Sequence, residues 1–164
     1  MRIARLGPED VARFLELRGQ ALDGDPASFR YTSADDRRVG AAGWRDRLER
    51  DHVVGALDEV RLLGVGGFAR FAGDKLDHKG LVWGMYVRPE ARGRGVADAL
   101  MRALIEHARG RVCLLQLTVM ADNTRARAFY ERHGFRLYGI EPRAVRQGDD
   151  LRAKALMWLP LSGR

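Results

Sequence analysis

Hydrophobic and polar positions change their spacing along this chain, and each change marks a predicted element. A short strand is expected at Arg2–Leu6, and a helix should follow from the turn Gly7–Asp10, where apolar residues recur at helical spacing. Pro8 suits the first turn of a helix, because a backbone N–H is not needed there. Leu22–Pro26 indicates a break, and a second helix is predicted over Ala41–Arg50. The first third of the chain thus predicts one strand and two helices.

Strand patterns dominate the middle of the chain. Two strands, His52–Leu57 and Val60–Ala72, should join through a tight turn at Asp58–Glu59, and a third is expected at Gly80–Val87. The second strand contains three glycines, which indicate a bulge or a close approach of another backbone: Gly64, Gly66 and Gly67.

Strands and helices alternate in the remaining part. A long helix is predicted over Gly93–Arg109, and the apolar run Val112–Met120 is typical of a strand buried on both faces. Asn123–His133 predicts another helix, which Gly134 should end, because glycine readily adopts the left-handed conformation beyond a helix C-terminus. Two closing strands are expected, at Phe135–Glu141 and Ala155–Leu161.

The order of elements predicts the fold class. Only Gly80–Met120 has the length and pattern of a parallel strand–helix–strand crossover. We therefore expect an α/β fold, with a mixed, mostly antiparallel sheet of about seven strands, a central parallel pair and about four flanking helices. No repeat or linker interrupts the chain, so a single domain is expected over residues 1–164.

Composition and charge restrict the expected cellular location and the expected binding partners. No run of about 18 apolar residues and no apolar N-terminal signal region is visible, and a single cysteine, Cys113, cannot form an internal disulfide. We therefore expect a cytoplasmic protein without a membrane partner; a homodimer is compatible with the sequence. The net charge is +7, but the arginines are scattered, which disfavours nucleic acid as a partner. Arg88, Arg92 and Arg94 are the exception, because they cluster.

That cluster surrounds a glycine turn with the chemistry of an anion site. Pro89 breaks the preceding strand, a short basic glycine turn follows, and a helix pattern then opens at once. Gly93 and Gly95 lack Cβ atoms, so a bulky anion can approach the backbone closely. The first N–H groups of the following helix have no intrahelical partner and lie at the positive end of its dipole. The turn can therefore hold a phosphate-bearing group.

Two familiar phosphate motifs do not fit this turn. A Walker loop ends in Gly-Lys-Ser/Thr, whereas this chain has Gly95-Val96-Ala97. A dinucleotide fingerprint requires a small residue where Asp98 stands. The glycines alone leave a plain strand-to-helix turn about as plausible as a binding site.

A second group of residues begins directly after the predicted apolar strand. The Asn123 side chain can cap the helix that follows it. Ala126 and Tyr130 are four residues apart and share one helix face, so the small residue leaves room beside the phenol.

The two groups together resemble the GCN5-related N-acetyltransferase (GNAT) family. Arg92 to Ala97 is similar to its Arg/Gln-x-x-Gly-x-Gly/Ala signature, and Asn123, Ala126, Tyr130 and Gly134-Phe135 are similar to its second motif. The spacing of one helix and one strand also fits, and the resemblance covers roughly residues 80–141. Asp25–Phe29 and Trp44–Leu48 also resemble the amine-side helices of small members.

The resemblance implies an N-acetyltransferase that moves the acetyl group of acetyl-CoA to a primary amine of a small molecule or peptide, by direct attack and without a metal. Tyr130 would be the catalytic acid that protonates the departing thiolate. The implied coenzyme-binding residues are the strand end, the turn and the second helix: Met85, Tyr86, Val87, Arg92, Gly93, Arg94, Gly95, Val96, Ala97, Asn123, Ala126, Phe129 and Tyr130.

The general base and the acceptor stay open at this stage. Many relatives carry a glutamate in the strand before the turn, but Leu81–Gly84 offers no carboxylate, which leaves Asp77, His78, Glu141, water or an already neutral amine. Cys113 has no nearby histidine and is interpreted as a buried, inert thiol rather than a nucleophile. The histidines show no metal-ligand spacing.

Aromatic and acidic residues are the candidates for the acceptor pocket. Five aromatics could form an apolar pocket: Phe29, Tyr31, Trp44, Trp83 and Tyr138. Four carboxylates could attract an ammonium group: Asp25, Asp35, Asp36 and Glu141. An alternative hypothesis is a non-catalytic coenzyme A binder or sensor, motivated by the missing strand glutamate and the positive charge.

Overall fold

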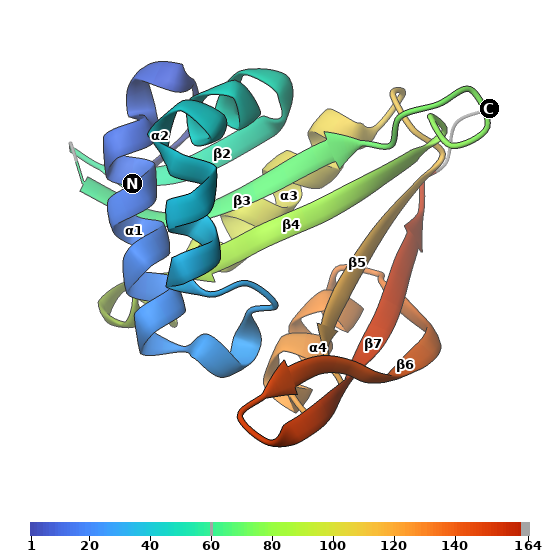
Figure 1. The fold of residues 1–164 in the computed structure, drawn as a ribbon. Coiled ribbons are helices and arrows are strands. Elements are labelled where there is room, and N and C mark those ends of the chain that lie inside the picture. Colours follow the sequence, from blue (N-terminus) through green and yellow to red (C-terminus); the bar gives the residue numbers. More distant parts are fainter. Residues whose placement is uncertain (60, 162–164) are drawn as a thin grey trace.

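A single seven-stranded sheet organises the chain (Figure 1). The structure, a computed structural model, describes residues 1–59 and 61–161. The strand order is β1-β2-β3-β4-β5-β7-β6, and only β4 and β5 are parallel neighbours. The strands are β1 Arg2–Leu6, β2 His52–Asp58, β3 Arg61–Arg70, β4 Lys79–Val87, β5 Leu114–Met120, β6 Arg136–Gln147 and β7 Asp150–Pro160. The predicted mixed, mostly antiparallel sheet with a central parallel pair is confirmed.

Within the described residues, four α-helices cover the two faces of the sheet: α1 Val11–Gly24, α2 Ser33–Arg50, α3 Val96–Ala108 and α4 Thr124–Arg132. Helices α1 and α2 pack on β2 and β3 around Phe14, Trp44 and Leu48. Helices α3 and α4 lie on the opposite face (Figure 1). None of the helices in the described ranges combines the length and apolar character that a membrane crossing requires.

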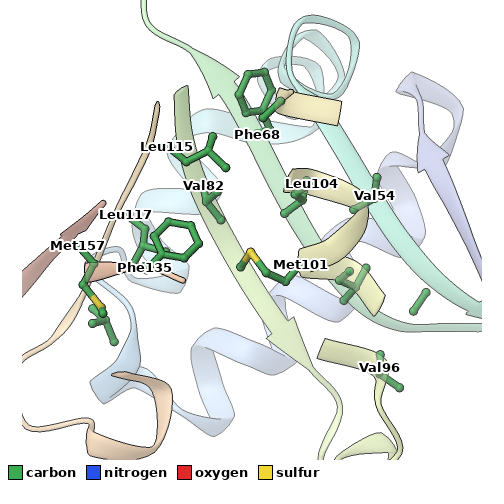
Figure 2. Close-up of a cluster of buried hydrophobic side chains, with 14 of the residues drawn as sticks. Val54, Phe68, Val82, Val96, Met101, Leu104, Leu115, Leu117, Phe135 and Met157 are labelled. Carbon is green, nitrogen blue, oxygen red and sulfur yellow. The ribbon is translucent and has the colours of Figure 1, made fainter. Parts of the chain in front are cut away.

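The core between α3 and the sheet explains why α3 is firmly placed. Leu100, Met101 and Leu104 are fully buried against the sheet. Met101 and Leu104 lie in one cluster with Phe135 and Met157 (Figure 2). Burying one such side chain contributes about 1.5–3 kcal/mol. The start of α3, and therefore the glycine turn before it, is held by this packing.

Helix α2 is longer than the sequence pattern predicts. It begins at Ser33 rather than Ala41, because Thr32 caps it: the Asp35 N–H donates to Thr32 Oγ1 at 3.2 Å, and the Thr32 N–H donates to Asp35 Oδ2 at 2.8 Å. Gly40 has φ +69°, which kinks the helix and separates its polar first half from the predicted second half. The missed half carries no apolar periodicity.

Several predicted boundaries shift for local reasons. Helix α3 begins at Val96 and not at Gly93, because Gly93 and Gly95 have positive φ. The two closing strands are longer than expected and form one extended hairpin. Val60, the first residue of the predicted strand Val60–Ala72, lies outside the described residues.

The prediction that β5 is buried on both faces is wrong. Leu115, Leu117 and Val119 are buried against α3 and α4, but Thr118 on the other face is exposed. The reason lies in the sheet: β4 and β5 pair only from Lys79 to Leu81. Beyond that point the two strands separate (Figure 1), and this face of β5 meets a pocket rather than a neighbouring helix.

Arg88 directs its side chain into the protein, which corrects the expectation that it joins the anion site. The side chain is 4% exposed. Its Nε donates to the Leu62 carbonyl oxygen at 2.7 Å, and its other nitrogens donate to Glu16 Oε1 at 2.8 Å and to Gln20 Oε1. Arg88 therefore ties α1 to the end of β4.

We expect Arg88→Met to lower the free energy of unfolding by about 2–3 kcal/mol, because the change removes three hydrogen bonds, one of them to a buried carbonyl. Thermal denaturation should show a drop of roughly 5–10 °C. Arg94→Met is the matched control, since Arg94 is exposed and its loss should not change the melting temperature. An equal drop in both variants would contradict this role of Arg88.

Candidate active site

Two grooves meet where β4 and β5 separate. The first, of about 460 Å³, runs along the end of β4, the glycine turn and α4. Twelve of the thirteen coenzyme-binding residues expected from the sequence line it; Arg94 does not. The second, of about 330 Å³, opens on the α1–α2 side of the sheet. Eight residues belong to both grooves and mark their junction: Asp25, Met85, Tyr86, Val87, Arg92, Asn123, Ala126 and Tyr130.

The glycine turn presents free backbone donors to the first groove. Gly93 and Gly95 have φ +74° and +75°, and no atom lies within 4 Å of where a Cβ would stand. Gly95 caps α3 without a side chain, and the first helical hydrogen bond runs from the Ala99 N–H to the Gly95 carbonyl. The N–H groups of the first turn therefore remain available to an anion.

Arginines surround this groove, although not the three that the sequence suggests. Arg92 lines both grooves, and its Nε donates to the Val87 carbonyl oxygen at 3.1 Å. Arg125 and Arg132 from α4 also line the first groove. The family motif does not include them, although they share one helix face with Phe129 at spacings of four and three residues. The groove is thus suited to a group with several negative charges.

The end of β4 offers backbone groups to the junction. The Arg88 N–H donates to the Leu63 carbonyl on β3 at 2.9 Å. Because successive N–H groups along a strand point to opposite sides, the Val87 N–H points away from β3. On that side β5 has already diverged, since its pairing with β4 ends at Leu81. Gly84, at φ +66°, adds a bulge before this segment.

Asn123 both caps α4 and contacts the opposite side of the junction. Its Oδ1 accepts from the Ala126 N–H at 3.0 Å, as predicted, and its Nδ2 donates to Ser28 Oγ at 3.4 Å. Ser28 Oγ in turn donates to Asp25 Oδ2 at 2.7 Å. This chain of contacts connects the loop after α1 to α4 across the mouth of the two grooves.

Tyr130 stands at the junction in an aromatic setting. Its ring lies 5.2 Å from that of Phe129 and 5.9 Å from that of Phe135. Burial raises the pKa of the Tyr130 phenol to about 12. The phenol is therefore a persistent proton donor at neutral pH.

The expected acceptor residues divide between the second groove and the core. Phe29, Tyr31 and Trp83 line the groove. Trp44 is 2% exposed, packs against Phe14 and does not line the groove. Tyr138 lies on β6, where its hydroxyl is 3.3 Å from Gln116 Nε2. Of the four carboxylates, only Asp25 lines the groove; Asp35 pairs with Arg38 and Asp36 with Arg18.

Comparison with known proteins agrees with this geometry. Residues 16–135 match the model of the "Acetyltransferase (GNAT) family". The chain is 32% identical over 148 residues to the N-alpha-acetyltransferase RimI of Mycobacterium tuberculosis, covering 88% of this chain and 84% of that protein. The chain belongs to the GNAT family of acetyltransferases.

Further similarities extend to a second curated relative and to solved structures. Mycothiol acetyltransferase of Rhodococcus erythropolis is 30% identical over 137 residues; the match covers 82% of this chain but only 46% of that protein. Among solved structures, yncA from Salmonella typhimurium, determined with its cofactor acetyl-CoA, has a TM-score of 0.83 at 20% identity, over 100% of this chain and 95% of that one. At 20% identity, the similarity to yncA concerns the fold alone.

Family membership decides between the two functional hypotheses. The chain is an acetyl-CoA-dependent N-acetyltransferase and not merely a coenzyme binder. Within the described parts of the chain, no group of three His, Cys, Asp or Glu side chains is placed to hold a metal ion.

The candidate bases that precede β4 lie at the wrong end of the sheet. Asp77 and His78 come before Lys79, where β4 and β5 are still paired, whereas the junction is at the other end of β4. Asp77 also pairs with Arg70 at 3.3 Å. Glu141 is exposed on β6 and lines neither groove.

Cys113 is exposed, which corrects the prediction of a buried thiol. The strand begins one residue later, at Leu114, so Cys113 precedes the core run instead of belonging to it. It lines neither groove. The thiol therefore has no contact with the junction.

Proposed function

We propose that this GNAT enzyme acetylates a primary amine of a small molecule or peptide by direct attack within a ternary complex. The observation that carries the proposal is the junction, where eight residues line both the first and the second groove. A donor held in one groove and an amine held in the other would meet beside Tyr130. Such positioning removes much of the entropic cost of a two-substrate reaction.

The first groove suits coenzyme A in its distribution of charge. The free N–H groups at the start of α3, with Arg92 and Arg125, would bind the diphosphate. The unpaired edge of β4 from Met85 to Val87 would hydrogen-bond the amide-containing arm. Ala126 and Phe129 would line the channel to the thioester.

The chain's own groups account for the charges that the reaction develops. As the amine nitrogen bonds to the thioester carbon, negative charge grows on the carbonyl oxygen, which the Val87 N–H can stabilise. The carbon–sulfur bond then breaks, the nitrogen gives up a proton, and the sulfur gains one. Tyr130 acts on that sulfur.

The raised pKa of Tyr130 refines its expected role. A phenol of pKa about 12 gives up its proton less readily than the ordinary phenol assumed from the sequence. Tyr130 therefore stabilises the leaving sulfur as a hydrogen-bond donor, and it transfers its proton as the sulfur becomes more basic in the desolvated junction. The resulting phenolate then takes a proton back from water.

Asp25 is the carboxylate that the structure places at the junction. It accepts from Ser28 Oγ and lines both grooves, whereas the sequence offered it only as one of four acidic candidates. An amine that reaches the junction could release its proton toward Asp25 or water.

A screen of amines tests the proposed function. Purified protein, acetyl-CoA and single amines from several classes are mixed, and free thiol is measured together with the mass of the amine product. We expect thiol release that depends on the amine and matches the acetylated product one to one. Thiol release without any acetylated amine would contradict transfer.

Cys113→Ala should leave kcat unchanged within about twofold, because the thiol is exposed and lines neither groove. A large loss of kcat, with an acetylated cysteine detected by mass spectrometry in the wild-type enzyme, would instead support a covalent route. Steady-state thiol release under saturating substrates provides the measurement.

A further inference from the structure

The second groove is strongly cationic for a site that must receive an amine. Five basic side chains line it: Arg18, Arg30, Arg47, Arg92 and Lys154. Asp25 is its one acidic lining residue among the residues described. An ammonium ion alone would be repelled by this lining, so the charge points to an additional anionic group on the acceptor.

Three of the five cations already have partners. Arg18 is paired with Asp36, and Arg47 Nε lies 3.1 Å from Asp51 Oδ2, with its guanidinium 3.8 Å from the centre of the Trp83 ring. Arg92 also lines the first groove. Among residues 1–59 and 61–161, Arg30 and Lys154 form no ion pair, and Glu141, opposite Lys154 on β6, is the carboxylate that acts on Lys154.

Lys154 is the more informative of the two, because it is buried. It is 6% exposed, it lies on β7, and its Nζ donates to Thr118 Oγ1 on β5 at 3.3 Å. A buried ammonium group that forms no ion pair is costly, because burial removes it from water. Since Thr118 Oγ1 accepts from Lys154, its own hydrogen is free to point at a ligand.

The charges around Lys154 also favour the binding of an anion beside it. Burial lowers the pKa of the Lys154 ammonium, and repulsion from Arg30 lowers it further. Glu141, opposite Lys154 on β6, has the smallest influence and raises the pKa. Two cations, Lys154 and Arg30, thus stand against one carboxylate, Glu141.

We propose that the acceptor is a small amino acid whose carboxylate binds between Lys154, Thr118 and Arg30, while its amine reaches the junction beside Tyr130. The inference rests on the proposed function and names the substrate class. The groove volume of about 330 Å³ lies at the low end for small-molecule sites, which suits a ligand of this size.

The cationic lining would then also assist catalysis. Positive neighbours disfavour a further positive charge, so the acceptor amine loses its proton more easily in the groove than in water. This effect explains how the reaction proceeds without a glutamate in β4. The carboxylate of the acceptor supplies the attraction that the amine lacks.

Matched substrate pairs test the proposal. Free amino acids are compared with their carboxamides and with the corresponding decarboxylated amines, and kcat and KM are measured by thiol release. We expect kcat/KM for the best free amino acid to exceed that of its carboxamide roughly 10- to 100-fold, mostly through KM, as for a charge-assisted hydrogen bond. Lys154→Met should remove this preference, because it should lower kcat/KM for the free amino acid far more than for its carboxamide.

Two further variants complete the test. Lys154→Arg should retain part of the preference for a carboxylate, and Lys75→Met, at an exposed lysine, should retain all of it. The proposal is overturned by equal kcat/KM for the paired substrates, by a preference for peptides with blocked carboxylates, or by a Lys154→Met variant that loses all substrates equally while it still melts like the wild type.

Calorimetric binding of coenzyme A to the same proteins separates this proposal from the proposed function. If coenzyme A binds and amines other than free amino acids are acetylated, the proposed function stands and the amino-acid assignment fails. If coenzyme A does not bind, the assignment of the first groove to coenzyme A fails, and with it the proposed function.

Discussion

Tyr130→Phe is expected to lower kcat by about 100-fold while the affinity for coenzyme A stays nearly unchanged. The substitution removes only the hydroxyl, so the ring contacts with Phe129 and Phe135 remain. The variant loses the hydrogen bond and the proton that the hydroxyl supplies to the leaving sulfur. Steady-state thiol release gives kcat, and calorimetry with coenzyme A gives the affinity.

Tyr138→Phe is the matched control, because Tyr138 is an exposed tyrosine on β6 outside both grooves, and its kcat should not change. The wild-type rate should also show no loss from ionisation of Tyr130 up to about pH 10, since burial raises the pKa of that phenol to about 12. An unchanged kcat in Tyr130→Phe over a wide pH range would remove Tyr130 from the reaction.

Gly95→Pro is expected to abolish the binding of coenzyme A. Proline fixes φ near −65°, whereas Gly95 has φ +75°, and it also deletes a backbone N–H at the turn. The free N–H groups at the start of α3 would then no longer face the groove. Calorimetry with coenzyme A measures the effect directly.

Two alanine variants separate the loss of the site from the loss of the fold. Gly95→Ala keeps the N–H but strains the positive φ, so it should weaken binding less than proline. Gly110→Ala changes a glycine with nearly the same φ, +74°, outside both grooves, and should cost stability without changing affinity. Normal binding of coenzyme A by a folded Gly95→Pro protein would disprove the role of the turn.

Most of the fold could be predicted because its signals are local. The strands of the sheet and the helix over Asn123–His133 follow from periodicity and from residues that start or stop a helix, and Gly134 does adopt φ +90°. The first half of α2 could not be predicted from periodicity, because Ala34 and Val39 are its only apolar side chains and do not form a helical repeat. Its signal was the pair Thr32 and Asp35, three residues apart, which form the capping box.

The parts of the candidate site that a local sequence motif specifies could be predicted. The positions of residues that depend on contacts with distant parts of the chain could not. Arg88 looks like part of a basic cluster, yet its partners Glu16 and Gln20 stand 72 and 68 residues away on α1. Lys154 gives no signal in the sequence, because its burial depends on how β7 pairs with β5. The open face of β5 likewise depends on the separation of β4 and β5 after Leu81.

The most direct test of the central claim is a two-substrate kinetic experiment. The concentrations of acetyl-CoA and of an accepted amine are varied together, and thiol release is recorded. Direct attack at the junction of the two grooves predicts intersecting double-reciprocal lines and no thiol release before the amine is added. Parallel lines, with a burst of thiol from enzyme and acetyl-CoA alone, would contradict it.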